Sequence, residues 1–176
     1  DVSGRLITLD GTADTTAGSA TDGETTAWTA MFKGLETYTT DRRAITYGVR
    51  ELPGASTVGF LTTVTTDANG ATVVNRQTEL TVRKFGLNNE SLAGAAFTLT
   101  NKSDANEVYT LAAGSGTTSW TLKGLKPAPV VYTLAETQTP AGYLPAANLD
   151  LRIDATSGAV YLADGNGNFT IATTNN

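Results

Sequence analysis

The chain has 176 residues, a formal net charge of -5, and neither cysteine nor histidine. Disulfides, thiol nucleophiles and histidine-based catalytic or metal sites are therefore excluded, and an acidic chain without a basic patch is not expected to bind nucleic acid. No apolar run reaches the length of a membrane span. Threonine- and valine-rich segments between glycine turns, without sustained helical periodicity, predict an all-β fold.

The first half contains five short segments that alternate or are rich in β-branched residues, and we expect strands there. A polar, low-complexity segment, residues 11–26, separates the first two and is interpreted as a long loop. The predicted strands cover residues 4–9, 26–32, 44–51, 60–65 and 71–75.

The second half has the same character, with eight predicted strands. They cover residues 79–85, 93–100, 107–112, 117–122, 129–136, 149–153, 159–163 and 168–175. Residues 164–168 carry oxygen-bearing side chains at alternate positions, as calcium loops do. They lack the glycine and the final acidic residue of such a loop, so we interpret them as a tight hairpin turn.

Two glutamates lie on the apolar face of their predicted strands. Alternate residues of a strand share a face, so each of these glutamates points toward the core, where an unpaired carboxylate is costly. The alternating residues are Val130, Tyr132, Leu134 and Glu136 in one strand, and Ile45, Tyr47, Val49 and Glu51 in the other. A strand-end carboxylate turned to solvent would explain one such glutamate, but the repetition favours a function.

These glutamates belong to a longer internal repeat. The segment from Trp28 to Leu35 is echoed by the segment from Trp120 to Leu125, and the spacing is that of a whole domain rather than of a short solenoid unit. We therefore expect two domains, residues 1–77 and 78–176. The lysine-bearing strand that opens the second domain has no counterpart before residue 4.

Lys84, Glu136 and Asn175 all face inward by the same alternation. Burial favours the neutral forms of lysine and glutamate. A neutral amine is a nucleophile, and a protonated glutamate can polarise an amide and transfer protons. In fixed geometry the three residues can form a Lys–Asn isopeptide bond with loss of ammonia. Asn176 is the alternative acceptor.

Taken in order, the motifs of both halves resemble Cna B-type domains, the prealbumin-like sandwiches of Gram-positive surface adhesins and pilins. In the second half they are residues 80–84, 92–99, 124–125, 132–136 (the E-box) and 140–143; in the first half they are residues 28, 34–38, 45–51 and 73–75. The resemblance implies two tandem immunoglobulin-like or prealbumin-like β-sandwiches, the first without its N-terminal strand. It also implies an isopeptide bond from Lys84 to Asn175 with Glu136 as catalyst.

In the first domain the resemblance places Glu51 at the catalytic position and Asn75 at the cross-link acceptor position. The lysine partner is missing together with its strand. The chain is cut before Asp1, another molecule donates the strand, or the domain is naturally incomplete. We favour the first explanation, because a sandwich without an edge strand exposes apolar surface and open hydrogen-bonding groups.

The resemblance further implies a function. We expect the stalk region of an extracellular, cell-wall-anchored adhesin or pilin of a Gram-positive bacterium; the alternative is an adhesive module that binds a host extracellular-matrix protein or glycan. An accessory domain of a secreted enzyme is a third possibility on fold analogy alone. Because the bond forms once, no enzyme is expected, and neither is a cofactor or metal. The expected partners are neighbouring domains of the same protein and a strand or lysine from an N-terminal segment, without nucleic acid or membrane.

Overall fold

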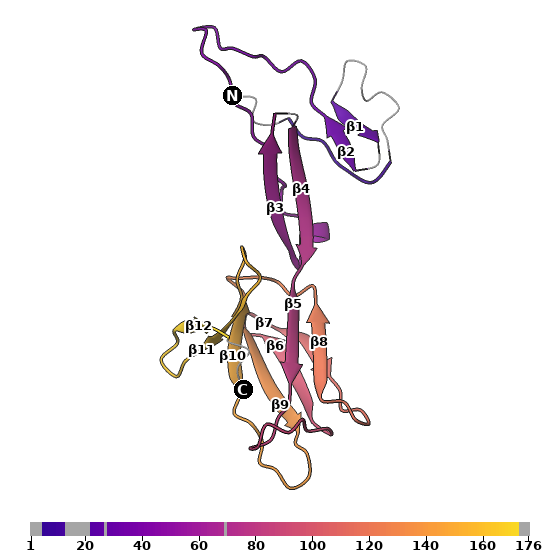
Figure 1. Cartoon of the computed structure of the whole chain (residues 1–176), viewed down its shortest axis with the longest axis vertical. Coiled ribbons are helices and arrows are strands. Elements are labelled where there is room, and N and C mark those ends of the chain that lie inside the picture. The colour runs from indigo at the N-terminus through magenta and orange to yellow at the C-terminus, as the bar shows by residue number, and fades with distance from the viewer. Residues whose placement is uncertain (1–4, 13–21, 27, 69, 173–176) are drawn as a thin grey trace. The chain divides into compact units, whose positions relative to one another are not determined.

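The computed structural model describes residues 5–12, 22–26, 28–68 and 70–172 (Figure 1). The chain divides into two compact units, one ending at Gly48 and the other beginning at Val49. The predicted domain boundary after residue 77 stays a prediction. Among the described residues there is no helix with the length and apolar character needed to cross a bilayer.

The described residues of the first unit form an antiparallel hairpin, made of β1 (Gly23–Thr26) and β2 (Thr29–Met31). The predicted strand 26–32 is therefore broken, because Trp28 adopts a positive φ of 62° and the chain reverses there. The loop prediction for residues 11–26 is wrong at β1. Trp28 is 68% exposed, unlike its second-half counterpart.

Two predicted strands, 4–9 and 44–51, are wrong in their described residues, which form no strand. A strand exists through hydrogen bonds to a neighbouring strand, and alternation alone does not supply one. Residues 44–51 instead keep an isolated bridge between Tyr38 and Ala44. The hydroxyl of Tyr47 donates to the carbonyl of Glu36 at 2.8 Å.

The second unit begins with a short 3-10 helix, η1 (Ala55–Thr57), and a hairpin. Its strands, β3 (Phe60–Asp67) and β4 (Gly70–Gln77), pair antiparallel from Phe60 opposite Gln77 to Asp67 opposite Gly70. The predicted strands 60–65 and 71–75 are confirmed, and both are longer than predicted.

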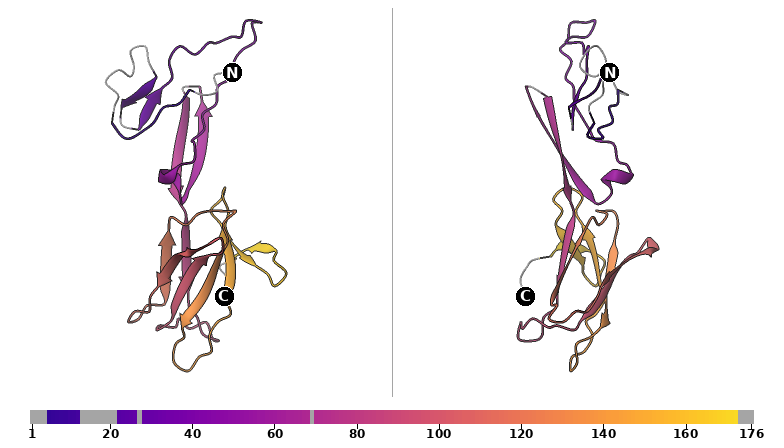
Figure 2. Two further views of the ribbon diagram at one scale, coloured as in Figure 1. Left: turned by 180° about the vertical axis from the view of Figure 1, so that it is seen from behind. Right: turned by 90° about the vertical axis from the view of Figure 1, so that its right-hand side faces the viewer.

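The remaining strands form a two-layered sandwich (Figure 2). A strand lies within each of the eight segments predicted for the second half, although the last of them, 168–175, forms a strand only over Phe169–Ile171 and its residues 173–175 lie outside the described ones. One layer pairs β5 with β8, and the other has the order β12-β11-β10-β9-β6-β7. The strands are β5 (Glu79–Arg83), β6 (Ala96–Asn101), β7 (Asp104–Leu111), β8 (Ser119–Lys123), β9 (Tyr132–Gln138), β10 (Leu149–Ile153), β11 (Val160–Ala163) and β12 (Phe169–Ile171). The predicted hairpin turn at 164–168 is also confirmed, since Asp164 N–H donates to the Asn168 carbonyl at 2.7 Å.

The core lies between these layers and follows the period-two pattern of the sequence. Alternate residues are buried in β5, β6, β9 and β10. The apolar core residues are Leu80, Val82, Ala95, Phe97, Leu99, Leu111, Leu125, Tyr132, Leu134, Leu151 and Ile153. Trp120 joins this core edge-on to Phe97, with ring centroids 5.2 Å apart.

Thr78 is the single residue between β4 and β5, and it is only 1% exposed. Its N–H donates to the Gly59 carbonyl at 2.9 Å, and its hydroxyl donates to the Leu125 carbonyl at 2.6 Å. Gly59 has a φ of 78°, and a Cβ there would lie 2.2 Å from the Gly124 carbonyl oxygen. The β3–β4 hairpin is therefore closely joined to the sandwich.

Candidate functional site

Lys84 and Glu136 meet between the two layers of the sandwich. Lys84 directly follows β5, and Glu136 lies on β9. The Lys84 Nζ lies 3.0 Å from Glu136 Oε1 and 3.1 Å from Oε2. The lysine side chain is 12% exposed and the glutamate side chain 0%. The prediction that Glu136 points inward with Tyr132 and Leu134 is confirmed.

The backbone around this pair holds both side chains in place. The N–H of Lys84 donates to the Thr118 carbonyl at 3.1 Å, and its carbonyl accepts from Leu92 N–H at 3.0 Å. On β9, Ala96 pairs with Gln138 and Phe97 with Glu136, so one extra residue follows the glutamate. Such bulges re-aim side chains and are common beside functional sites.

The two oxygens of Glu136 differ in their surroundings. Oε2 accepts hydrogen bonds from Lys84 Nζ and, at 2.6 Å, from the backbone N–H of Ala146. Oε1 is buried and receives no hydrogen bond from any described residue, although Lys84 Nζ lies nearby. The ion pair with Lys84 Nζ, which lies 3.0 Å from Oε1, offsets part of the cost of burying this carboxylate.

The predicted acceptor Asn175, like its neighbour Asn176, lies outside the described residues, so the cross-link stays a prediction. The last strand was predicted to turn its alternate residues, from Phe169 to Asn175, toward the core, and this is wrong at Ile171 in its described part. Ile171 is 55% exposed, because β12 is the edge strand beyond β11. The Arg152 guanidinium lies over the Phe169 ring, with its Cζ 4.5 Å from the ring centroid.

In the first half, the structure brings Glu51 and Asn75 together. Asn75 Nδ2 donates to Glu51 Oε1 at 2.8 Å. The hydroxyl of Thr62 lies 2.7 Å from Glu51 Oε2 and 2.8 Å from Asn75 Oδ1, and so can donate to either. Sequence reasoning missed Thr62, which pairs with Asn75 across the hairpin. Thr62 and Asn75 are exposed, and residues 49–77 contain no lysine.

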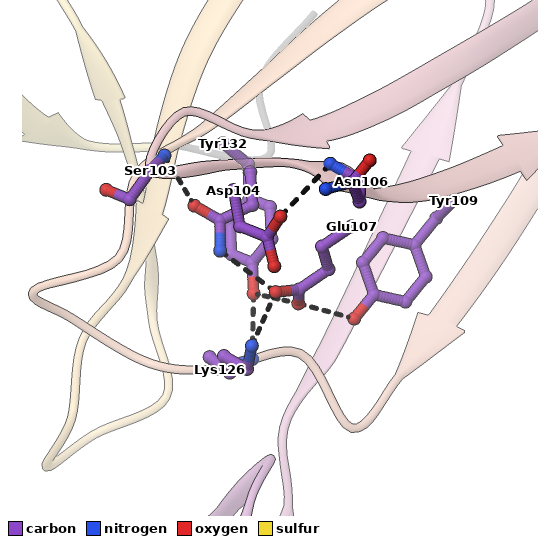
Figure 3. A network of polar contacts seen from close by, with 8 residues as sticks. Ser103, Asp104, Asn106, Glu107, Tyr109, Lys126 and Tyr132 are labelled. Atoms are coloured by element: carbon purple, nitrogen blue, oxygen red, sulfur yellow. Dashed lines mark hydrogen bonds and ion pairs between the residues drawn. The ribbon is translucent and has the colours of Figure 1, made fainter.

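A second lysine–glutamate–asparagine cluster was not predicted from the sequence (Figure 3). Glu107 Oε2 accepts from Lys126 Nζ at 2.5 Å and from Asn101 Nδ2 at 2.9 Å. Its Oε1 accepts from Tyr109 at 2.9 Å and from Tyr132 at 3.5 Å. The available signal was the alternation that puts Asn101, only 4% exposed, on the core face of β6.

The electrostatics of this cluster favour the charged forms of its lysine and its glutamate. Burial raises the pKa of Glu107, but hydrogen bonds from Lys126, Asn101 and Tyr109 outweigh it and lower the pKa to about 2. The hydrogen bond to Glu107 raises the pKa of Lys126, whose side chain is 41% exposed. Both groups therefore stay charged at neutral pH, and an ammonium is not a nucleophile. This cluster is an ion-paired network.

The Lys84–Glu136 pair, with its buried carboxylate, lies in a sandwich whose described residues include no group of three or more metal-ligating side chains. The fold defines a structural β-sandwich class of protein. Residues 78–168 match the prealbumin-like fold domain, and residues 5–76 match the Cna protein B-type domain. The first match covers just over half of the chain, which therefore belongs to the prealbumin-like fold domain family. No curated protein matches the chain significantly.

Both matches are to structural, non-enzymatic domains of the kind found in Gram-positive surface adhesins and pilins. The predicted fold class, two tandem Cna B-type or prealbumin-like domains in an all-β chain, is thereby confirmed.

Proposed function

We propose that the chain is part of the stalk of a cell-wall-anchored adhesin or pilin, and that its second domain is locked by an isopeptide bond between Lys84 and Asn175. The observation that carries this proposal is the Lys84 Nζ lying 3.0 Å from a Glu136 carboxylate whose side chain is 0% exposed. Its stalk partners would be the neighbouring domains of the same surface protein.

The reaction balances without any co-reactant. The neutral Lys84 Nζ attacks the carboxamide carbon of Asn175 and forms the new C–N bond. Glu136 takes the proton that the amine loses and delivers it to the departing amide nitrogen, which leaves as ammonia. Glu136 returns to its starting state, and folding supplies the proximity that an amine and an unactivated amide otherwise lack.

Such a bond suits a stalk. If the loop-closure arithmetic for disulfides is applied, a tie between residues about 90 apart stabilises the fold by about 4–5 kcal/mol. Mechanically, a tie from the first strand to the end of the last transfers a pulling force to a covalent bond instead of to strand hydrogen bonds. The domain then resists extension and proteases without any disulfide.

The test is the intact mass of the purified chain, followed by peptide mapping. We expect the wild type to be lighter than its sequence by one ammonia, with a cross-linked peptide joining Lys84 to Asn175. Lys84→Ala and Glu136→Ala should keep the full mass. Lys126→Ala is the matched control, because Lys126 also contacts a glutamate; it should still lose ammonia. A wild type of full mass would refute the proposal.

For the first domain, we propose that Glu51 and Asn75 form the catalytic and acceptor parts of an equivalent site, with the lysine supplied from outside residues 1–176. The 2.8 Å hydrogen bond between their side chains supports this. We expect Asn75 to keep its amide in the isolated chain, and a chain extended at its N-terminus to lose a second ammonia. A peptide linking Asn75 to Lys33 would contradict this assignment.

A further inference from the structure

We infer that Glu136 uses its two oxygens differently: the backbone amide of Ala146 anchors Oε2, which leaves Oε1 to carry the proton. We further infer that a hydrogen bond between Tyr143 and Glu90 holds the loop that supplies this amide. The inference rests on the proposed isopeptide reaction and adds the residues that position its catalyst.

The loop after β9 brings the amide back to the glutamate. Pro140 to Tyr143 form a turn in which Tyr143 N–H donates to the Pro140 carbonyl at 3.2 Å. Gly142 has a φ of 86°, which is the conformation that the third residue of a type II turn requires. The chain therefore reverses after the strand, and Ala146 N–H reaches Glu136 Oε2 at 2.6 Å.

A second loop meets the first through one side-chain hydrogen bond. The Tyr143 hydroxyl donates to Glu90 Oε1 at 3.2 Å. Glu90 closes its own loop, because its Oε2 accepts from Asn88 N–H at 2.9 Å and its carbonyl accepts from Gly86 N–H at 2.9 Å. That loop returns to Lys84 through the Leu92 N–H bond described above. The Tyr143–Glu90 hydrogen bond thus links the segments that hold the two reactive side chains.

A hydrogen bond that anchors one oxygen of the Glu136 carboxylate determines which oxygen is left to accept a proton. The terminal torsion of a glutamate is broad and roughly two-fold, so an unanchored carboxylate can exchange its oxygens. A short hydrogen bond from a backbone N–H to a carboxylate is charge-assisted and stronger than a neutral one. Oε2 already accepts from Lys84 Nζ and from Ala146 N–H, whereas Oε1 lies 3.0 Å from the same Nζ and accepts no hydrogen bond from a described residue, so Oε1 keeps its capacity for the proton that Lys84 loses.

The test removes the amide donor and follows the rate of bond formation. Ala146→Pro deletes the N–H, and Ala147→Pro is the matched control one residue further along the same loop. The full chain is made by a short pulse of cell-free synthesis, chased, quenched in denaturant and weighed. We expect Ala146→Pro to slow ammonia loss by about tenfold or more, the factor expected from one lost hydrogen bond to a charged group. Ala147→Pro should match the wild type.

The hydrogen bond between Tyr143 and Glu90 is tested in the same assay. Tyr143→Phe and Glu90→Leu should each slow ammonia loss, and Glu90→Gln, which keeps an acceptor oxygen for Tyr143, should restore part of the rate lost in Glu90→Leu. Melting temperatures are compared in a Lys84→Ala background, where no bond forms. A positioning role predicts slower reaction with little change in that background.

The outcomes separate this inference from the proposed function. A wild type that never loses ammonia refutes the isopeptide reaction itself. If the wild type loses ammonia and Ala146→Pro reacts as fast as Ala147→Pro, only the anchoring role of the Ala146 amide is refuted. If Ala146→Pro does not fold in the Lys84→Ala background, Tyr143→Phe decides, and a wild-type rate there overturns the inference.

Discussion

Replacing Thr78 by valine should destabilise the joint between the hairpin and the sandwich, because it removes a hydroxyl while keeping the shape of the side chain. The hydroxyl donates to the Leu125 carbonyl at 2.6 Å, in a place where Thr78 is 1% and Leu125 0% exposed. A buried carbonyl that loses its donor costs about 1–3 kcal/mol. For a domain of about 100 residues, a loss of about 2 kcal/mol corresponds to a fall in Tm of roughly 8–16 °C.

Differential scanning calorimetry at neutral pH measures this fall, with Thr81→Val as the matched control. The Thr81 hydroxyl lies 3.3 Å from that of Thr121 at an exposed site, so its loss should change stability by no more than about 0.5 kcal/mol. Thr78→Ser should recover most of the wild-type Tm. If Thr78→Val melts together with Thr81→Val, the hydroxyl does not stabilise the joint and the reasoning from its burial is wrong.

Three further predictions concern the sandwich and its joint. The pKa of Glu107 lies at about 2, below its ordinary 4.5, so its contribution to stability is present above pH 4.5 and is lost as the pH falls toward 2. The Tm difference between wild type and Glu107→Gln, measured by circular dichroism, should therefore shrink over that range; a constant difference would contradict it. Lys84→Ala removes the proposed bond and should lower the Tm by at least 15 °C or so, given about 4–5 kcal/mol for the tie. Gly59→Ala forces a Cβ to 2.2 Å from a carbonyl oxygen at a φ of 78° and should lower the urea midpoint, whereas Gly54→Ala, with open space around it, should not.

The sequence allowed the second half to be predicted well because its alternating segments have partners within the same domain. Glu136 was correctly placed inward because β9 lies between β6 and β10, where one face must meet the core. The segment 44–51 has the same alternation, but among the described residues it pairs only through the single bridge at Ala44, so the pattern alone did not make it a strand. Alternation reports which face a residue would take, and pairing decides whether a strand forms.

The contacts missed from the sequence depend on register and loop geometry. Thr62 meets Asn75 only because the β3–β4 register sets them opposite each other. The Glu107 network needs β6, β7 and β9 side by side. The side chain of Ala146 has no functional group, and its backbone amide reaches Glu136 only because the turn at Gly142 reverses the chain. Backbone donors of this kind leave no signal in residue type.

The two lysine–glutamate clusters of the sandwich lie at opposite ends of one strand, β9. Tyr132, Leu134 and Glu136 share a face, so the tyrosine and the glutamate lie about 13 Å apart along the strand. Leu134, which pairs with Leu99 on β6, fills the space between them. At one end the Tyr132 hydroxyl accepts from Lys126 N–H at 2.9 Å, and Lys126 pairs with the ionised Glu107. At the other end Glu136 has no such set of donors, and one of its oxygens stays without a hydrogen bond from the described residues. The same residue types therefore form a network where several side chains donate to the carboxylate, and a candidate reactive pair where a fully buried carboxylate meets a single lysine.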